Sequence, residues 1–590
     1  MKSLIFLSFL STLVVLGQSS DITSTVFGGD VHGLPAAFGD FDSDELIDMF
    51  VIKNFTTVQV MFASDEKPLL RSREQYNCPF DKNITSVVPG NFDGDDFMDV
   101  LVTTRDEKTK ITEVYILWGE KERLNCSNAR KSILKMKGQP LAIDYNNDMI
   151  IDLFGTDVHN NRMFWIFNND RTVNSTKMTT PDKDSKPIQM PHSNAFLDLN
   201  NDSLADLVVT TQNMDKSKSA NRSLEIWYRQ KSGFRYSKDI PIPEFSVVGQ
   251  TSYLDVASKG EINFVLPVCK DKECRDSHIY VYWNNEWKDM EVSFIDDAGT
   301  TWGFAHDSER KYIDTITMRG GDFNLDGYLD LLVTLTSTSG KTRSFVLVNT
   351  PTNSKGSFDR TFKVHWNRFD LSYNNSVTAV FYDFYHNGFL DIIFVLRDEG
   401  DVYRTAAFKN SDGYDTTFLK VMVISKTTHS SQDIVQPRMK NSHFCGTNLP
   451  GASIAYKITT KYGSLRKATV AQLPQSAHNV MNLPFVIFGL GRTHNFVDSL
   501  SVGLFNKSRE WTSYIIPNSH MVVVTNPLSE SSEWKALLVI PYKLVSHCAV
   551  ALTGICGLIT LIIAALYLKE RRDDNIQKSQ EAHKFHFSAM

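Results

Sequence analysis

Short apolar runs in which aromatic and β-branched residues alternate recur along most of the chain. Examples are "VYILWG" (114–119), "MFWIFNN" (163–169), "SLEIWYR" (223–229) and "IYVYWNN" (279–285). These runs are rich in aromatic and β-branched residues, which suit a pleated and packed surface. Short runs of this composition predict β-strands. Because no long segment between the two ends of the chain shows the apolar period of a helix, the pattern predicts an all-β protein.

A loop rich in acidic residues precedes one such run and has a regular spacing. Counted from its first aspartate, "GDFNLDGYLD" (321–330) has carboxylate or amide side chains at positions 1, 3, 5 and 9 and a glycine at 6; they are Asp322, Asn324, Asp326 and Asp330. Oxygen ligands at alternate positions of a tight, glycine-containing loop suit a hard cation such as Ca²⁺. An EF-hand would place a glutamate at position 12, but Val333 stands there and an apolar run continues. The spacing predicts a calcium loop that leads into a strand.

The same frame recurs along the chain. The other full copies are Asp40, Asp42, Asp44 and Asp48; Asn91, Asp93, Asp95 and Asp99; Asp144, Asn146, Asp148 and Asp152; and Asp198, Asn200, Asp202 and Asp206. A weaker copy keeps Asp383, Asn387 and Asp391 but has Tyr385 at position 3. Another copy begins at Asp255 and has Lys259 at position 5. An ammonium there could replace a cation, so we expect that loop to hold no metal.

The spacing of these copies predicts the architecture. Their first positions fall at residues 40, 91, 144, 198, 255, 322 and 383, so the repeat is 51 to 67 residues long. This is about the length of a propeller blade, and a radial array of blades leaves only short, protected edges. We therefore predict a seven-bladed β-propeller over residues 21–413. A single such loop is equally consistent with a solvated turn, because Asp, Asn and Gly favour turns. Five full copies in register favour calcium with a structural role.

The repeats resemble the FG-GAP repeats of integrin α-subunits, and the "FG" dipeptide itself occurs in "VFGGD" (26–30). The resemblance implies a seven-bladed propeller with calcium in the loops of some blades. It also implies that position 7 contributes a backbone carbonyl, which the five full copies would supply from Leu46, Phe97, Ile150, Leu204 and Tyr328.

Two uninterrupted apolar runs lie near the ends of the chain. The run 4–16 follows Lys2 and precedes small residues, which predicts a secretory signal peptide over 1–19, because the run is too short to span a bilayer. The run 544–568 has 25 residues and no formal charge apart from His547, so it is long enough to form a transmembrane helix. "KERR" (569–572) follows directly, and the positive-inside rule places the tail 569–590 in the cytosol. The prediction is a single-pass type I plasma-membrane protein with an extracellular N-terminus.

The segment between the repeats and the apolar run predicts a second domain. Short alternating runs with Gly and Pro punctuation, among them 417–426, 451–463 and 484–504, predict a second all-β domain over 417–526. The order "FLKV … GAS … FGLG … VDSLSV" resembles the ASPIC/UnbV module that follows FG-GAP-like propellers in other proteins. Integrin α-subunits have no such module here.

Sequons and cysteines agree with secretion. The N-x-S/T sites predicted to carry glycans are Asn54, Asn83, Asn125, Asn174, Asn221, Asn374 and Asn506. "CKDKEC" predicts a local disulfide between Cys269 and Cys274, and a weaker prediction pairs Cys78 with Cys126 between neighbouring blades. These pairings leave Cys445 without a partner.

Charge and motifs narrow the class of function. The net charge of −6, with 22% charged residues, argues against a nucleic-acid binder, which would show a basic stripe. The sequence contains no H-E-x-x-H, G-x-S-x-G or P-loop motif, so we expect no enzymatic activity.

The whole order of segments resembles the T-cell immunomodulatory protein family, also called the linkin family. The resemblance implies a plasma-membrane protein with roles in cell adhesion and tissue integrity, a tail associated with RuvB-like ATPases and tubulin, and an immunomodulatory ectodomain in vertebrates. We therefore expect a calcium-stabilised propeller that binds extracellular protein partners through loops held on a rigid scaffold. The alternatives are a carrier or chaperone of the secretory pathway, an immunomodulatory ligand and, least favoured, an ectoenzyme.

Overall fold

The computed structural model describes residues 20–587 with internal gaps. The gaps are 96, 121–122, 180–185, 215–219, 232, 307–314, 353–357, 370, 401, 413–414, 426–445, 461–462, 476–480, 493–495, 513–514 and 540–541. The predicted signal peptide and Cys445 lie outside the described residues. The chain divides into two compact units, one that ends at Leu538 and one that begins at Val539.

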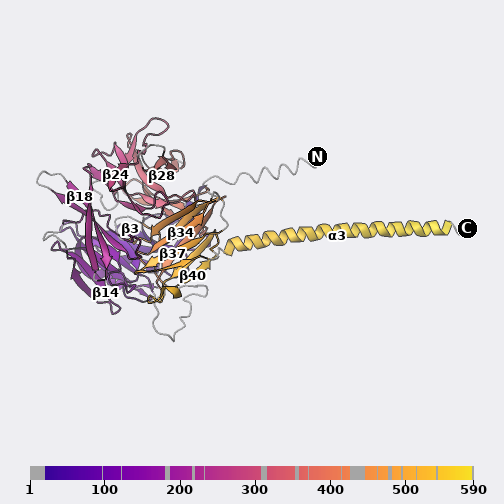
Figure 1. Ribbon diagram of the computed structural model, residues 1–590, viewed down its shortest axis with the longest axis horizontal. Helices are drawn as coiled ribbons and strands as arrows, with labels where there is room; N and C mark the ends of the chain where they lie inside the picture. The colour runs from indigo at the N-terminus through magenta and orange to yellow at the C-terminus, as the bar shows by residue number, and fades with distance from the viewer. Residues whose placement is uncertain are drawn as a thin grey trace. The chain divides into compact units, whose positions relative to one another are not determined.

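Most of the first unit consists of β-sheets, in agreement with the predicted all-β class (Figure 1). The antiparallel pairings group these strands into seven blades. The strands of blades 1 to 3 are β2 (Leu34–Gly39), β3 (Asp48–Lys53), β4 (Thr57–Ala63), β5 (Leu70–Ser72) and β6 (Cys78–Pro79); β7 (Ile84–Gly90), β8 (Asp99–Arg105), β9 (Ile111–Leu117) and β12 (Leu134–Ile143); and β13 (Asp152–Asp157), β14 (Arg162–Phe167) and β15 (Val173–Lys177). The long β12 pairs with both β9 and β13, so blades 2 and 3 share one seven-stranded sheet.

The remaining blades repeat this order. Their strands are β16 (Ala195–Leu197), β17 (Asp206–Met214), β18 (Ala220–Gln230) and β19 (Gly233–Ile242); β20 (Val247–Val248), β21 (Ser252–Leu254), β22 (Asn263–Cys269), β23 (Ser277–Trp283) and β24 (Glu286–Asp289); β25 (Trp302–Phe304), β26 (Arg319–Gly321), β27 (Asp330–Ser337), β28 (Thr342–Pro351) and β29 (Arg360–Val364); and β30 (Ser376–Tyr382), β31 (Asp391–Arg397), β32 (Tyr403–Lys409) and β1 (Ser20–Asp21). Short connecting elements are α2 (Thr23–Phe27), β10 (Gly119–Glu120), β11 (Arg123–Leu124), η1 (Glu74–Tyr76), η2 (Cys126–Arg130) and η3 (Leu371–Tyr373).

The blades close into a ring. Contacts between inner strands join β2 to β7, β12 to β16, β21 to β26 and β26 to β30. The Tyr253 hydroxyl donates to the Ser193 carbonyl between blades 5 and 4, and the Tyr382 hydroxyl donates to the Ile47 carbonyl between blades 7 and 1. The N-terminal strand β1 is the outermost strand of blade 7, where Ser20 pairs with Lys409. The first and last strands of the propeller are thus hydrogen-bonded to each other within one blade, which covers the edge of β32.

The blades pack face to face, which explains why several strands read as continuous apolar runs. In β31 every residue from Asp391 to Leu396 is buried, because this strand is covered on both faces. Phe154 of blade 3 and Trp227 of blade 4 belong to one apolar cluster between neighbouring sheets. Burial on both faces fixes the register of each strand.

The second part of the first unit is a β-sandwich, called the sandwich domain here (residues 417–538). One sheet has the order β36-β33-β39-β40 and the other the order β35-β34-β37-β38. The strands are β33 (Thr417–Ile424), β34 (Ser453–Thr459), β35 (Leu465–Ala471), β36 (Val486–Gly491), β37 (Ser499–Leu504), β38 (Lys507–Trp511), β39 (Ser519–Val524) and β40 (Lys535–Val539), with η4 (Ser531–Glu533) before the last. Leu419, Ile454, Phe488 and Trp534 lie in its core.

The second unit contains one long helix, α3 (Tyr542–Phe587), shown in yellow in Figure 1. By length and composition, Ala549–Glu581 is the candidate membrane span among the helices that the structure describes, with a mean hydropathy of 2.5 in its most apolar window. The apolar run 544–568 predicted to cross the membrane lies within α3.

Candidate metal loops and the domain interface

Each repeat places its nine-residue motif in the turn between two paired strands, the second of which begins at position 9 of the motif. We call these segments the first to seventh acid loops; they are 40–48, 91–99, 144–152, 198–206, 255–263, 322–330 and 383–391. Their side chains fold the loop themselves. In the first loop the Asp40 carboxylate accepts the backbone N–H groups of Asp44 and Glu45, each at 3.0 Å, and Asp44 accepts that of Leu46 at 2.9 Å. The acidic pattern thus builds the turn as well as offering oxygens to a cation.

The aspartate at position 9 ties three parts of the blade together in every blade except the fifth, where Asn263 stands at this position. In blade 1, Asp48 is the first residue of β3, and its two oxygens accept the N–H groups of Phe41 and Ala63, both at 2.8 Å. The other residues that clasp the backbone in the same way are Asp99, Asp152, Asp206, Asp330 and Asp391. Burial raises the pKa of Asp152 and Asp206 to about 7 and that of Asp330 to about 8. Position 9 therefore has a backbone role that is independent of metal.

The first acid loop gathers the most negative charge. Asp40, Asp42 and Asp48 can each bring one carboxylate oxygen within 4.8 Å of the others, and this is the one such group of three acidic, His or Cys side chains found in the described part of the chain. Burial, followed by the charge of Asp42, raises the pKa of Asp44 to about 7. One oxygen of Asp42 is buried without a hydrogen-bond partner among the described residues. The donor set of this loop fits a hard cation.

The third, fourth and sixth acid loops have an amide at position 3, which lessens the electrostatic repulsion among the carboxylates of each loop. The amide donates to the carboxylate at position 5 in all three: Asn146 to Asp148 at 2.6 Å, Asn200 to Asp202 at 3.0 Å and Asn324 to Asp326 at 3.2 Å. Burial raises the pKa of Asp322 strongly, and the charges of Asp326 and Asp330 raise it further. These loops keep carboxylates for a cation at positions 1, 5 and 9.

Two acid loops already contain a cationic side chain. In the second loop Arg171 donates to Asp93 through Nε at 2.9 Å and forms an ion pair through Nη2 at 2.8 Å. In the seventh loop the ammonium of Lys420, which comes from the sandwich domain, lies 3.0 Å from Asp383. A protein cation therefore balances these two carboxylates directly.

The fifth loop differs from the sequence expectation. Lys259 forms an exposed ion pair with Asp359, so its ammonium does not take the place of a cation in the loop. The Asp255 carboxylate instead accepts the N–H groups of Lys259, Gly260 and Thr469 at 3.0, 2.7 and 3.1 Å. With alanine and lysine at positions 3 and 5, this loop is satisfied by backbone donors.

The sandwich domain contacts several of these loops. Gly489 donates its N–H to Asp322 at 3.1 Å, and Arg466 donates to the Asp326 carbonyl at 2.9 Å. The N–H of Asn506 donates to the Ser203 carbonyl of the fourth loop at 2.9 Å. Because Thr469 and Lys420 contact the fifth and seventh loops, the sandwich domain docks on the side of the propeller that carries the acid loops.

One interface residue explains the "FGLG" segment (488–491). A Cβ at Gly489 would lie 2.1 Å from the Asp322 carboxylate and 2.5 Å from the backbone of Leu325. Only glycine allows the backbone of β36 to approach the sixth loop this closely.

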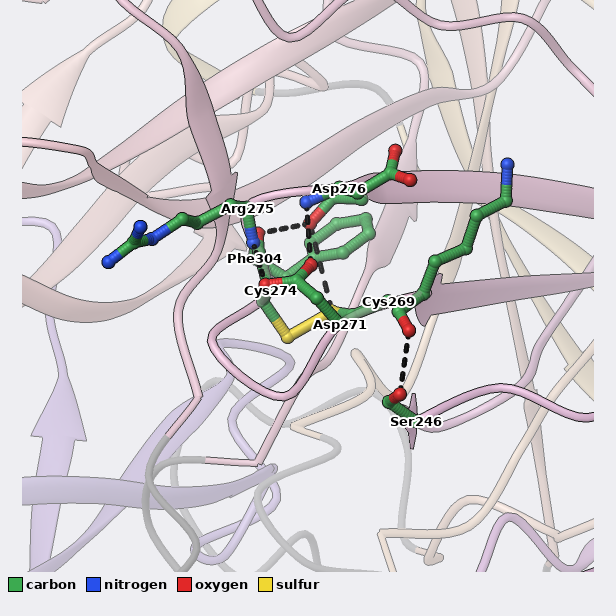
Figure 2. The surroundings of a disulfide bond; sticks show 9 residues. Ser246, Cys269, Asp271, Cys274, Arg275, Asp276 and Phe304 are labelled. Atoms are coloured by element: carbon green, nitrogen blue, oxygen red, sulfur yellow. Dashed lines mark hydrogen bonds between the residues drawn. A yellow bond between two sulfur atoms is a disulfide. The ribbon is translucent and has the colours of Figure 1, made fainter.

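Both disulfides named above are present. Cys269 and Cys274 are bridged with an S–S distance of 2.10 Å in the turn between β22 and β23, where Asp271 accepts the N–H groups of Arg275 and Asp276 (Figure 2). Cys78 on β6 is bridged to Cys126 at the start of η2, which links blade 1 to the segment after β9. Among the predicted glycan sites Asn54, Asn83, Asn174, Asn221 and Asn506 are exposed, and Asn125 and Asn374 are half-buried.

Sequence reasoning did not find the interface residues. Lys420 had one signal, because it is a single charged residue inside the apolar strand "TFLKVMVI" (417–424). Arg171 had none, because it lies in a turn 78 positions from Asp93.

A ring of seven blades with acid loops, capped by a β-sandwich and followed by a candidate membrane helix, defines a propeller protein with membrane-protein character. Residues 444–538 match a family model described as "ITFG1, C2 domain". This family model describes the sandwich domain as a C2 domain, whereas its sequence pattern resembles the ASPIC/UnbV module.

Relatives of this chain match over nearly its whole length. The human protein named T-cell immunomodulatory protein is 34% identical over 99% of this chain and 98% of its own, and the rat protein of the same name is 35% identical over 97% and 94%. Protein linkin of Caenorhabditis elegans is 26% identical over 95% of this chain and 96% of its own. The chain belongs to the T-cell immunomodulatory protein family.

Proposed function

We propose that this is a single-pass plasma-membrane protein whose propeller and sandwich domain lie outside the cell and bind protein partners in cell adhesion. The observation that carries the proposal is the order of parts: two disulfides and exposed sequons lie in a β-rich unit that precedes a C-terminal candidate span. Disulfides persist in oxidising compartments. A cluster of lysine and arginine follows the apolar stretch directly, which favours a cytosolic tail.

Calcium is the cofactor we assign to the propeller, in a structural role. Asp40, Asp42, Asp44 and Asp48, with the carbonyl of Leu46, would hold the ion in the first loop, and its chemistry there is charge neutralisation. The third, fourth and sixth loops would bind through their remaining carboxylates. The second loop is the weakest of the five full copies, because Arg171 shares Asp93. We assign no catalytic role to any of these acids.

A second candidate is an immunomodulatory ligand for other cells, which the printed name of the mammalian relatives favours. The two candidates differ in what binding does. An adhesion protein holds cells together, whereas a ligand changes the behaviour of the cell that it binds.

The test uses intact cells that express the full chain with a tag after Met590. A membrane-impermeant biotin reagent should label the protein, and a tag antibody should stain only permeabilised cells. Expression should raise cell aggregation, and soluble ectodomain added in excess should suppress it. Retention inside the cell would refute the surface assignment and favour a secretory-pathway carrier. Surface labelling without aggregation, together with a response of T cells to the soluble ectodomain, would favour the ligand.

A further inference from the structure

A lysine of the sandwich domain lies where a cation would neutralise the seventh acid loop. The Lys420 ammonium on β33 is 3.0 Å from an oxygen of Asp383, and the two side chains are 4% and 0% exposed. The ammonium also lies 3.9 Å from the centroid of the Phe485 ring, within reach of a cation–π interaction. Burying an ammonium is costly unless it is paired. The pair is therefore a built contact between β33 and blade 7.

The rest of the seventh loop shows why a lysine can serve there. Asp383 accepts the N–H groups of Asn387 and Gly388 at 3.0 and 3.1 Å, as the corresponding aspartate does in the first loop. Position 3 is Tyr385, which brings no carboxylate. Position 5 is Asn387, an amide whose oxygen accepts the N–H of Phe389 at 3.2 Å. The loop keeps the fold of its relatives but has fewer oxygens for a metal, and the ammonium supplies the positive charge.

We propose that Lys420 is a built-in cation that replaces a metal ion at the seventh loop and locks the sandwich domain onto blade 7 without calcium. Arg171 plays the equivalent part inside the propeller at the second loop, where both groups belong to neighbouring blades. Lys420 differs because it acts between domains. The comparison with a metal rests on the calcium assignment above, whereas the lock itself does not.

The first test is a double-mutant cycle on the full-length protein in detergent with excess chelator, read by thermal unfolding. The variants are Lys420→Met, Asp383→Asn and the double variant. Each single variant leaves one buried charge unpaired and should lower the Tm by about 5 °C or more. The double variant, which buries no charge, should be more stable than either single one. Lys457→Met is the matched control, because the ion pair of Lys457 with Glu510 is about half exposed and should shift the Tm by only about 1 °C.

The second test adds calcium to the same proteins. Lys420→Met frees Asp383, so calcium should raise its Tm by more than it raises that of the wild type, and the additional Asp383→Asn change should abolish the excess. Lys420→Arg keeps a tethered cation and should behave as the wild type.

Additive Tm losses in the cycle would overturn the lock, because they would show that Lys420 contributes packing alone. If Lys420→Met does not fold, the comparison of Asp383→Asn with the double variant decides, since the lock requires the double variant to be the more stable. Calcium that adds no excess stability to Lys420→Met would overturn the replacement of a metal. A wild type whose Tm ignores chelator would instead refute calcium in the other loops, which keeps the two failures distinguishable.

Discussion

Arg162 of blade 3 forms a two-pronged ion pair with Glu225 of blade 4, with Nη1 at 2.6 Å from one carboxylate oxygen and Nη2 at 3.0 Å from the other. Both side chains are buried, at 2% and 7% exposure. The Trp227 indole donates to the same carboxylate at 3.1 Å, and Arg162 also donates to the Lys186 carbonyl at 2.8 Å. The pair joins two blades through donors and acceptors that are buried from solvent.

The first prediction is that Arg162→Met lowers the free energy of unfolding by about 3–5 kcal/mol, because it leaves the Glu225 carboxylate buried without its charge partner. Chemical denaturation of the ectodomain measures the change. Lys110→Met is the control, since the Lys110–Glu107 pair is exposed and should matter by less than about 1 kcal/mol. Equal effects of the two changes would contradict the role of the blade 3–4 pair.

Calcium removal should destabilise the propeller. Binding to the native state alone contributes about 2.7 kcal/mol per site at a hundredfold excess over Kd, so chelator should lower the Tm of the wild type markedly. Asp42→Asn should remove one bound calcium, because Asp42 is one of the three acids that converge in the first loop. Metal analysis of the dialysed protein gives the stoichiometry. Lys259→Ala should leave it unchanged, since Lys259 pairs with Asp359 outside the fifth loop; an unaltered count in Asp42→Asn would exclude the first loop.

Gly489→Ala should separate the sandwich domain from the sixth loop. The added methyl would lie 2.1 Å from the Asp322 carboxylate, so β36 must move away. Limited proteolysis should then cut the connection between propeller and sandwich faster, while the far-UV spectrum stays β-rich. Gly29→Ala is the control, because a Cβ there meets no atom within 4 Å. Equal cleavage of both variants would show that this approach does not hold the domains together.

His192 should make the protein sensitive to acid. Its Nε2 is 3.0 Å from the Gln139 carbonyl, and its Nδ1 accepts the N–H of Asn194 at 3.2 Å, so the neutral ring is satisfied at both nitrogens. Burial lowers the pKa of His192 from 6.5 to about 4. Because the folded pKa is the lower one, the unfolded chain binds the proton first. The stability from this residue is complete above pH 6.5 and is lost as the pH falls towards 4, by about 3 kcal/mol.

The measurement is the unfolding free energy between pH 7 and pH 4 in the wild type and in His192→Gln. The difference between the two proteins separates the effect of His192 from that of the carboxylates. Protonation of many of these carboxylates changes the unfolding free energy in the opposite direction. Parallel curves would mean that His192 does not carry the effect.

The fold could be predicted from the sequence because its signal is repeated. Seven copies of one frame give the blade number, and alternation gives the strands between them. The same repetition hid a distinction within the motif, since Asp48 and its equivalents at position 9 clasp backbone N–H groups whether or not a metal is bound. The sequence motif therefore does not tell an aspartate that holds the backbone from one that also binds a metal.

The domain interface could not be predicted because its contacts are distant in the chain and mostly involve the backbone. Thr469 and Gly489 reach their loops through N–H groups, which every residue except proline possesses. Lys259 shows the opposite error, because its place in the motif predicted a contact that its long side chain does not make.

The strand β1 makes the ring dependent on the order of synthesis. Ser20 is made before any of the blades, yet its partner Lys409 follows only after the six other blades have been synthesised. Until β32 is made, β1 has no strand to pair with, and β32 then keeps an open edge until β1 joins it. Such distant pairing slows folding and exposes an edge that other chains can join. Ring closure is therefore the last folding step of a newly made propeller, and a chain that ends before blade 7 cannot complete it.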